Sequence, residues 1–301
     1  MLRPSQETTS EVWLRQESAD MNYLQAEVLS HDAVPLFVRR YRSQTDEQDR
    51  TLVVVHGACE HGERYNHIAR KLTKSGWNVI VADLKGHGKS GGVPSHIDEF
   101  QHYLLDLDRL WEHFQLKPET TAILGHSMGG LISARYVQTR PDCCNSLVLM
   151  SPLLRHSVPV PPWTLAVGKV LSYFAPRVRF KTGIDPAHAT RNEDVLARRM
   201  DDQLMRQSVT AGWYFEMMSA IDRVWADAEK VDLPVLLMQG AQDKIVDAHA
   251  PEEWLAKVSS QDVTFKMLAD HFHELLNEPD WRHTLNEVIE WLECHSVSAA
   301  V

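Results

Sequence analysis

The sequence predicts an α/β fold with a mostly parallel central sheet, helices on both faces and an α-helical insertion. The first observation is that short apolar runs alternate with helical stretches between residues 51 and 150. The second is that this alternation stops near residue 151 and returns at residue 234. We therefore expect residues 1–151 and 227–301 to form the sheet domain, with residues 152–226 inserted as a helical cap.

The expected strands are apolar or β-branched runs bounded by polar and glycine-rich connections. Runs rich in β-branched residues, such as 51–55, are typical of strands that are buried on both faces. The expected strands are 23–29, 34–41, 51–55, 77–82, 121–124, 146–150, 234–240 and 263–268. The helices expected between and after them are 67–75, about 97–116, 131–137 and 281–294.

Composition and charge exclude several classes of protein. The chain has 301 residues, of which 44% are hydrophobic and 24% are charged, as is typical of a folded domain. A net charge of −10 without a long basic run argues against a nucleic-acid partner. The first residues lack the apolar core of a signal peptide, and no apolar run approaches the roughly 20 residues that span a bilayer. The four cysteines have no metal-ligand spacing, so we expect a reduced, cytoplasmic protein without a metal.

The stretch from residue 121 to residue 137 holds the candidate nucleophile. An apolar run leads into Gly125-His126-Ser127-Met128-Gly129, and a helical pattern follows. A strand, Gly-x-Ser-x-Gly and a helix form the context of a nucleophile elbow, a strained turn that requires small neighbours on each side of the serine. The alternative is a glycine-rich turn that happens to contain a serine, and the partners of Ser127 decide between the two.

An activated serine needs a base and an acid that orients the base, in the chain order Ser, Asp or Glu, His. After the strand at 234–240, Asp243 is the expected acid, whereas the rival Asp247 fits the start of the next helix better. After the strand at 263–268, we favour His273 over His271 as the base, because His273 opens a helix-like run that can turn its side chain toward the serine.

Acyl transfer also requires hydrogen-bond donors for the developing oxyanion. One expected donor is the backbone N–H of Met128, directly after the serine. The other is the backbone N–H of Ala58, in the loop that follows the strand at 51–55. An ordinary turn at the end of that strand is the alternative interpretation of His56-Gly57.

Together these motifs resemble the α/β-hydrolase superfamily, and more specifically its monoacylglycerol lipase and lysophospholipase branch, which includes serine aminopeptidase-like members. The resemblance covers most of the chain outside the insertion. It is carried by His56-Gly57-Ala58-x-Glu60-His61-x-x-Arg64-Tyr65, Asp83-x-x-Gly86-His87-Gly88-x-Ser90, Gly125-His126-Ser127-Met128-Gly129-Gly130 and His273-Glu274-Leu275-Leu276-Asn277-Glu278. It implies Ser127, Asp243 and His273 as the catalytic triad, the amides of Ala58 and Met128 as the oxyanion hole, and a cap over the active site.

One position departs from this branch. Cys59 stands where the branch usually has glycine, so its thiol is expected either to narrow the acyl channel or to make the enzyme sensitive to thiol reagents. The oxyanion hole itself uses backbone atoms and is not affected.

Two apolar clusters lie in the expected cap. Apolar residues at 163, 166, 167, 170, 171 and 174 share one helical face. This face either packs on the protein's own core, lines an acyl tunnel or contacts a membrane surface. The second cluster, at 213–218, is expected to line an apolar pocket.

We therefore expect a serine carboxylester hydrolase that acts on single-chain lipids, with monoacylglycerol as the favoured substrate and without a cofactor. A lysophospholipase, a short-chain carboxylesterase, a peptidase and an acyltransferase are the enzymatic alternatives. A ligand receptor built on an inactive hydrolase is the alternative from another class, although all three triad positions are filled.

Overall fold

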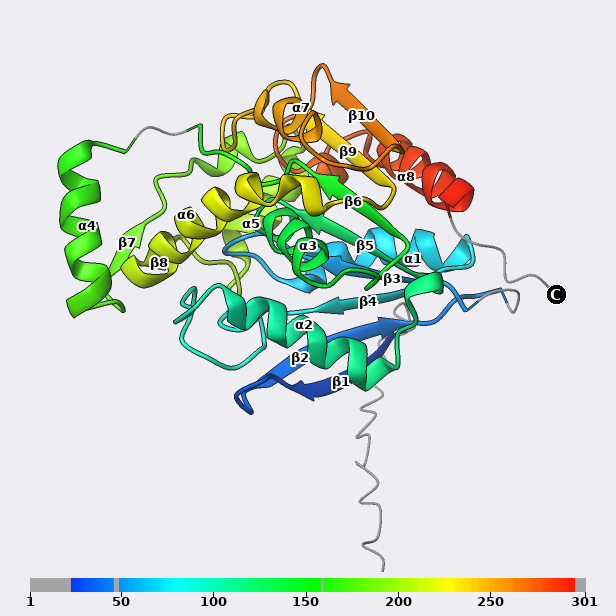
Figure 1. Cartoon of the computed structure of the whole chain (residues 1–301), viewed down its shortest axis with the longest axis horizontal. Coiled ribbons are helices and arrows are strands. Elements are labelled where there is room, and N and C mark those ends of the chain that lie inside the picture. Colours follow the sequence, from blue (N-terminus) through cyan, green and yellow to red (C-terminus); the bar gives the residue numbers. More distant parts are fainter. Residues whose placement is uncertain (1–22, 46–48, 158–159, 296–301) are drawn as a thin grey trace, which may run out of the picture.

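A computed structural model describes residues 23–45, 49–157 and 160–295, so residues 1–22 of the expected sheet domain lie outside the described part. The strands of the main sheet are Tyr23–Leu29 (β1), Pro35–Tyr41 (β2), Thr51–Val55 (β3), Asn78–Ala82 (β4), Thr121–His126 (β5), Ser146–Met150 (β6), Val235–Gly240 (β9) and Val263–Leu268 (β10). Their order across the sheet is β1-β2-β4-β3-β5-β6-β9-β10 (Figure 1). β2 is antiparallel to both of its neighbours, and every later pair is parallel. The predicted mostly parallel α/β sheet is therefore confirmed.

Helices cover both faces of this sheet, and each face has its own buried apolar cluster. One face packs against α1 and α8, for example through Ile68 and Leu285. The other face packs against α2, α3, α6 and α7, for example through Leu104 and Leu131. These helices span Asn66–Lys74 (α1), Gln101–Phe114 (α2), Met128–Thr139 (α3), Ala211–Ala226 (α6), Ala250–Leu255 (α7) and Trp281–His295 (α8). Short 3-10 helices occupy Gly62–Tyr65 (η1), Pro118–Thr120 (η2), Pro186–His188 (η3), Ala228–Lys230 (η4) and Leu275–Asn277 (η5).

The chain between β6 and β9 contains two further helices, α4 (Pro162–Phe174) and α5 (Glu193–Asp201), before it reaches α6. It also contains β7 (Arg179–Lys181) and β8 (Ser208–Thr210), which pair antiparallel in a small second sheet. The sequence pattern pointed to helices in this segment and to no buried strand, and it did not indicate these two short strands. Strands of three residues are too short to show an alternating pattern, and every residue of β7 is exposed.

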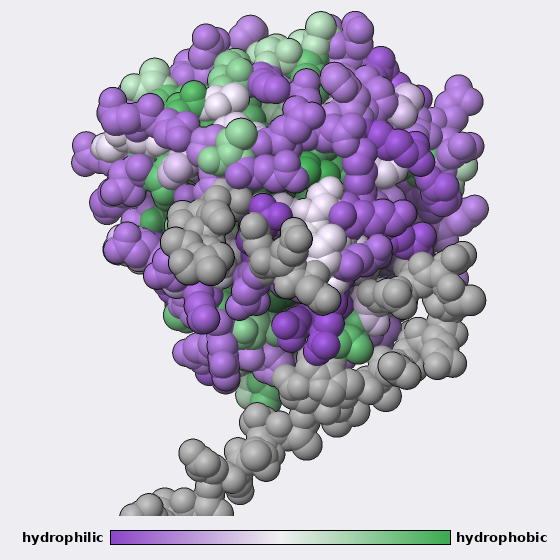
Figure 2. Space-filling model, turned by 90° about the vertical axis from the view of Figure 1, so that its right-hand side faces the viewer, coloured by the Kyte–Doolittle hydropathy of each residue, from purple (hydrophilic) through white to green (hydrophobic). Residues whose placement is uncertain are grey.

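α4 stands apart from the sheet (Figure 1). It turns several apolar side chains to solvent. Trp163 is 71% exposed, Tyr173 76% and Phe174 87%. Of the three alternatives for the predicted apolar face, packing on the protein's own core is therefore excluded. The helix instead contacts α6 through Gly168, where an added Cβ would lie 3.2 Å from the Phe215 ring. The opposite side of the molecule, seen in Figure 2, is mainly hydrophilic.

No helix in the described ranges combines the length and the apolar character needed to cross a membrane. Because β3, β5, β6, β9 and β10 run parallel, the loops at their carboxyl ends meet at one edge of the sheet. The residues predicted to be catalytic all lie in these loops or at their borders.

Candidate active site

Ser127 lies between β5 and α3 in a strained turn. Its backbone has φ 53° and ψ −119°, a conformation that L-residues rarely adopt and that persists where the surroundings impose it. The surroundings are tight: an added Cβ on Gly125 would lie 2.4 Å from the carbonyl oxygen of Gly129, and one on Gly129 would lie 2.0 Å from the carbonyl oxygen of Val55. Such contacts leave no room for a side chain at either glycine. The predicted strand, strained serine and helix are all present.

The structure brings Asp243 and His273 together. Asp243 follows β9 and His273 follows the neighbouring β10, and the Asp243 Oδ2 to His273 Nδ1 distance is 2.7 Å. The backbone N–H groups of Ile245 and Val246 donate to Asp243 Oδ1 at 2.8 and 3.1 Å, which fixes the carboxylate. The ring of His273 lies 4.8 Å from that of His126, the residue before Ser127, so the histidine lies beside the elbow.

Burial and charge set opposite pKa shifts in this pair. Burial alone would lower the pKa of His273, but the charge and hydrogen bond of Asp243 outweigh it and hold that pKa above its ordinary value. Burial alone would raise the pKa of Asp243, but the charge and hydrogen bond of His273, with the two backbone donors, hold it below its ordinary value. The pair is therefore arranged for a carboxylate that stabilises an imidazolium.

The two rival residues lie elsewhere. Asp247 accepts a hydrogen bond from the backbone N–H of His249 at 2.9 Å, at the approach to α7, and pairs with Arg155 at 3.0 Å. His271 Nε2 lies 3.2 Å from Asp280 on the side of α8. Each has a local structural partner that explains its position.

The two predicted oxyanion donors lie next to Ser127. An added Cβ on Gly57 would lie 3.3 Å from the Ser127 Cβ, so the loop that carries Ala58 packs directly against the elbow. Met128 is the first residue of α3, where backbone N–H groups have no partner within the helix and the helix dipole favours negative charge. The Ala58 loop and the N-terminus of α3 thus both border Ser127, and their backbone N–H groups stay the expected oxyanion donors.

A buried network of four charges supports the active-site loops. Glu60 Oε1 accepts the Gly57 N–H at 2.6 Å, and Glu60 Oε2 accepts from Arg64 Nε at 3.0 Å. Arg64 also contacts Glu274, the residue after His273. Glu274 Oε1 accepts from Arg199 on α5 at 2.5 Å. The network thus connects the oxyanion loop, the histidine loop and the inserted segment.

None of these four residues had an expected role from the sequence. Glu60, Arg64 and Glu274 belong to the motif blocks that carry the family resemblance, so a signal for them was present. Arg199 lies on an amphipathic helix with other charged residues, and only the packing of α5 brings it to Glu274.

Backbone hydrogen bonds add to this connection. The N–H of Arg206 donates to the carbonyl of Cys59 at 2.9 Å, and the N–H of Glu274 donates to the carbonyl of Ala189 at 2.7 Å. The segment between β6 and β9 is thus joined to the loop on each side of the elbow.

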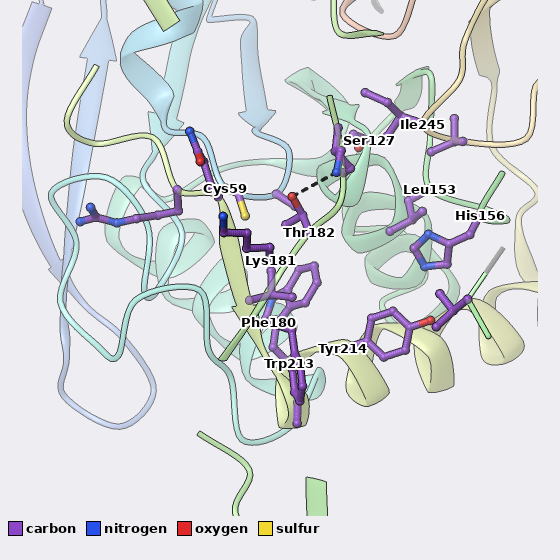
Figure 3. Close-up of a pocket in the computed structure, with 18 of the residues that line it drawn as sticks. Cys59, Ser127, Leu153, His156, Phe180, Lys181, Thr182, Trp213, Tyr214 and Ile245 are labelled. Atoms are coloured by element: carbon purple, nitrogen blue, oxygen red, sulfur yellow. Dashed lines mark hydrogen bonds between the residues drawn. The ribbon is translucent and has the colours of Figure 1, made fainter. Parts of the chain in front are cut away.

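A cavity of about 420 Å³ opens between Ser127 and the inserted segment (Figure 3). In the figure Phe180, Trp213 and Tyr214 lie across the cavity from Ser127. Its lining is mainly apolar: Ala58, Leu153, Val160, Leu165, Phe180, Ile184, Met200, Met205, Val209, Trp213, Tyr214, Phe215, Ile245 and Val246 contribute to it. The expectation that the cluster at 213–218 lines an apolar pocket is met by its first three residues, whereas Met217 is buried in the core.

Cys59 lines the same cavity and is 5% exposed. Its φ of 61° lies in the left-handed region that glycine adopts most easily, which agrees with the departure noted in the sequence. Burial raises the pKa of its thiol, which reduces the thiolate fraction and hence the reactivity of this residue. Of the two expected consequences, a narrower channel fits this environment better than sensitivity to thiol reagents.

A strained serine between a strand and a helix, beside an Asp–His pair carried by later strands of the same parallel sheet, defines the α/β-hydrolase class. Within this class the chain belongs to the serine aminopeptidase S33 family, whose model matches residues 46–280. The resemblance seen in the motifs is thereby confirmed.

Relatives of known name extend over nearly the same length. Phospholipase YtpA of Bacillus subtilis is 30% identical over 239 residues, which cover 79% of this chain and 92% of the relative. The monoglyceride lipase of Rattus norvegicus is 30% identical over 268 residues, covering 87% of this chain and 88% of the relative. The crystal structure of a Paleococcus ferrophilus monoacylglycerol lipase superposes with a TM-score of 0.80 at 29% identity, covering 87% of this chain and 99% of that one.

Proposed function

We propose that this chain is a serine hydrolase that cleaves carboxylic esters of single-chain lipids, and that monoacylglycerol is its substrate. The observation that carries the proposal is the mainly apolar cavity that begins at Ser127. An apolar cavity with few polar groups suits one acyl chain better than a small polar substrate. The monoacylglycerol lipase and monoglyceride lipase among the similar proteins support the same substrate.

In the proposed mechanism, Ser127 Oγ attacks the ester carbonyl while His273 accepts its proton. Because Nδ1 of His273 is held by Asp243, Nε2 is the nitrogen that remains for this transfer. The backbone N–H groups of Ala58 and Met128 stabilise the oxyanion, and His273 then protonates the leaving glycerol oxygen. The same histidine activates water, which releases the fatty acid, and none of these steps calls for a metal or a cofactor.

We assign residues 152–226 as the cap over this site and residues 1–151 and 227–301 as the hydrolase core. Support comes from the cavity wall, much of which this segment supplies. The exposed apolar residues of α4 support transient contact with a membrane surface, where monoacylglycerol is found. We expect the protein to act in the cytoplasm and to be peripheral to the membrane.

A lysophospholipid is the second candidate substrate, and a specific observation favours it. Lys181, Arg199 and Arg206 line the same cavity, and a phosphate headgroup pairs well with such cations. Arg199 is already neutralised by Glu274, which leaves Lys181 and Arg206 for that role. The similar phospholipase YtpA fits this alternative.

The test is fatty-acid release from monooleoylglycerol and from oleoyl lysophosphatidylcholine at equal concentration, with Ser127→Ala as the blank. We expect a preference for the glycerol ester and a loss of turnover of about a millionfold in the blank, as for loss of a catalytic serine. A preference for the choline lipid would move the assignment to lysophospholipase, and activity on short esters alone would move it to carboxylesterase. Full activity of Ser127→Ala would refute the mechanism, and failure of a fluorophosphonate probe to label Ser127 would favour a non-catalytic receptor.

A further inference from the structure

Two histidines and two aspartates gather where the turn between β1 and β2 meets α2, at the edge of the sheet formed by β1 and β2 (Figure 1). His31 and Asp32 belong to the turn, and His102 and Asp106 belong to α2. His102 and Asp106 are four residues apart, so the helix presents them on one side. His31 Nδ1 lies 2.8 Å from Asp106 Oδ1, and the ring centroids of His31 and His102 are 4.3 Å apart.

Two buried atoms of this cluster have no hydrogen-bond partner among the described residues: Oδ2 of Asp106 and Nδ1 of His102. The Asp106 side chain is only 3% exposed, so water does not readily supply the missing partner. A buried carboxylate oxygen without a partner, such as Asp106 Oδ2, costs free energy that a bound cation would recover.

We propose that this cluster is a zinc site in which His31, Asp32 and Asp106 are the protein ligands and solvent water completes the coordination. One ligand atom from each of these three residues lies within 4.8 Å of the others. Tetrahedral zinc with bonds of about 2.0–2.2 Å places its ligand atoms about 3.3–3.6 Å apart. The observed distances from His31 Nδ1, 2.8 Å to Asp106 Oδ1 and 3.9 Å to Asp32 Oδ1, lie on either side of that range.

The donor set selects among metals. Imidazole nitrogen favours zinc and other late first-row ions, whereas magnesium and calcium prefer oxygen ligands alone. The site has no thiolate, which would favour softer ions. One imidazole with two carboxylates therefore suits Zn²⁺ better than Mg²⁺.

The neighbouring charges are compatible with a divalent cation. Lys85 pairs with Asp32 Oδ2, and Ser30 Oγ donates to Asp32 Oδ1 at 2.7 Å. The cluster thus sets two carboxyl groups, Asp32 and Asp106, against the single ammonium group of Lys85. Coordination at His31 Nδ1 requires the tautomer that carries its proton on Nε2.

The site is accessible from solvent, and a bound zinc ion would connect two elements of the fold. The side chains of His31 and Asp32 are 19% and 43% exposed, so the turn is open to solvent. A bound ion would join the β1–β2 turn to α2, and thereby an edge of the sheet to a helix that covers one face. It lies outside the cavity at Ser127, and the proposed hydrolysis does not depend on it.

The test is calorimetric titration of the EDTA-treated full-length protein with ZnCl₂, with MgCl₂ as the comparison metal. We expect one Zn²⁺ per chain, and a loss of affinity of at least about tenfold in His31→Gln and in Asp32→Asn, since even outer-shell changes reach this size. Both residues lie in a solvent-accessible turn, so these variants should fold. The matched control is His283→Gln on α8, which removes an exposed histidine 3.4 Å from Glu287 and should bind zinc as wild type does.

A second readout is the melting temperature. Zinc that binds the folded state raises it, and the two turn variants should lose this rise while His283→Gln keeps it. The proposal is wrong if the wild-type protein binds no zinc at millimolar ZnCl₂, or if both turn variants bind it with wild-type affinity, because the ion would then be held elsewhere.

Discussion

Arg64 joins two buried carboxylates, and replacing it with methionine should both destabilise the fold and change the pH dependence of catalysis. Its guanidinium donates to Glu60 at 3.0 Å and also contacts Glu274, and all three side chains are at most 9% exposed. Methionine keeps much of the apolar volume of the side chain. Arg199 would then be the one arginine of the network left to compensate two buried carboxylates.

The size of the effect follows from burial. Removing one partner of a buried ion pair costs about 3–5 kcal/mol, because the other charge remains buried without compensation. With an m-value of about 3 kcal/mol per M urea, the unfolding midpoint should fall by more than about 1 M. The matched control is Arg70→Met on the exposed side of α1, which should change the free energy of unfolding by no more than about 0.5 kcal/mol.

The second consequence concerns His273. Glu274 and Glu60 both contribute to holding the pKa of His273 above its ordinary value, behind the larger effect of Asp243. Without Arg64 their negative charge is less compensated, so the acid limb of the kcat/KM profile should move to higher pH. A wild-type urea midpoint in Arg64→Met would refute the assigned stabilising role, and an unmoved acid limb would show that these charges do not act on His273.

Three further predictions concern the base, the cap and the elbow. In the wild-type enzyme, kcat/KM should fall on acidification with an apparent pKa above about 6.5, because protonated His273 cannot accept the serine proton. A midpoint below that value would contradict the pairing of His273 with Asp243. Trp163→Ser and Phe174→Ser should each weaken binding to phosphatidylcholine vesicles by about tenfold in a sedimentation assay. Neither variant should change the rate of hydrolysis of a short soluble ester. The control variant Met267→Ser, on β10, should bind the vesicles as the wild type does. Gly129→Ala should lower the free energy of unfolding by at least about 1–3 kcal/mol and should also lower kcat, because the added Cβ would lie 2.0 Å from a backbone oxygen. Wild-type stability and turnover in this variant would contradict the tight packing at Gly129.

The sheet could be predicted because its buried strands are marked in the sequence by short runs of apolar and β-branched residues. Residues of β3, β5 and β6 are buried on both faces, and most of the residues in these strands are apolar or β-branched. The elbow could be predicted because a strained turn places strict limits on its neighbours. The rule of chain order pointed to Asp243 and His273, which the structure places 2.7 Å apart, while their catalytic roles stay part of the proposal.

The inserted segment was less predictable, for physical reasons. Periodicity shows which residues of α4 share a face, but not whether anything covers that face, and Trp163 and Phe174 are exposed. Nothing local marks Arg199 as a partner of Glu274, because that contact depends on how α5 packs. The three-residue strands β7 and β8 are held by pairing with each other and not by their composition.

The hydrogen bonds that join the inserted segment to the core also limit how related enzymes can exchange parts. The bonds from Arg206 to Cys59 and from Glu274 to Ala189 connect backbone atoms, so they depend on the path of the chain and not on side-chain identity. A chimera that receives the whole inserted segment of a relative can keep both bonds, even at low sequence identity, if the backbone of that segment follows the same path. A chimera spliced within that path would lose them, and with them the support of the loops on both sides of the serine. Recombination between members of this family should therefore succeed at the ends of β6 and α6 more often than between them.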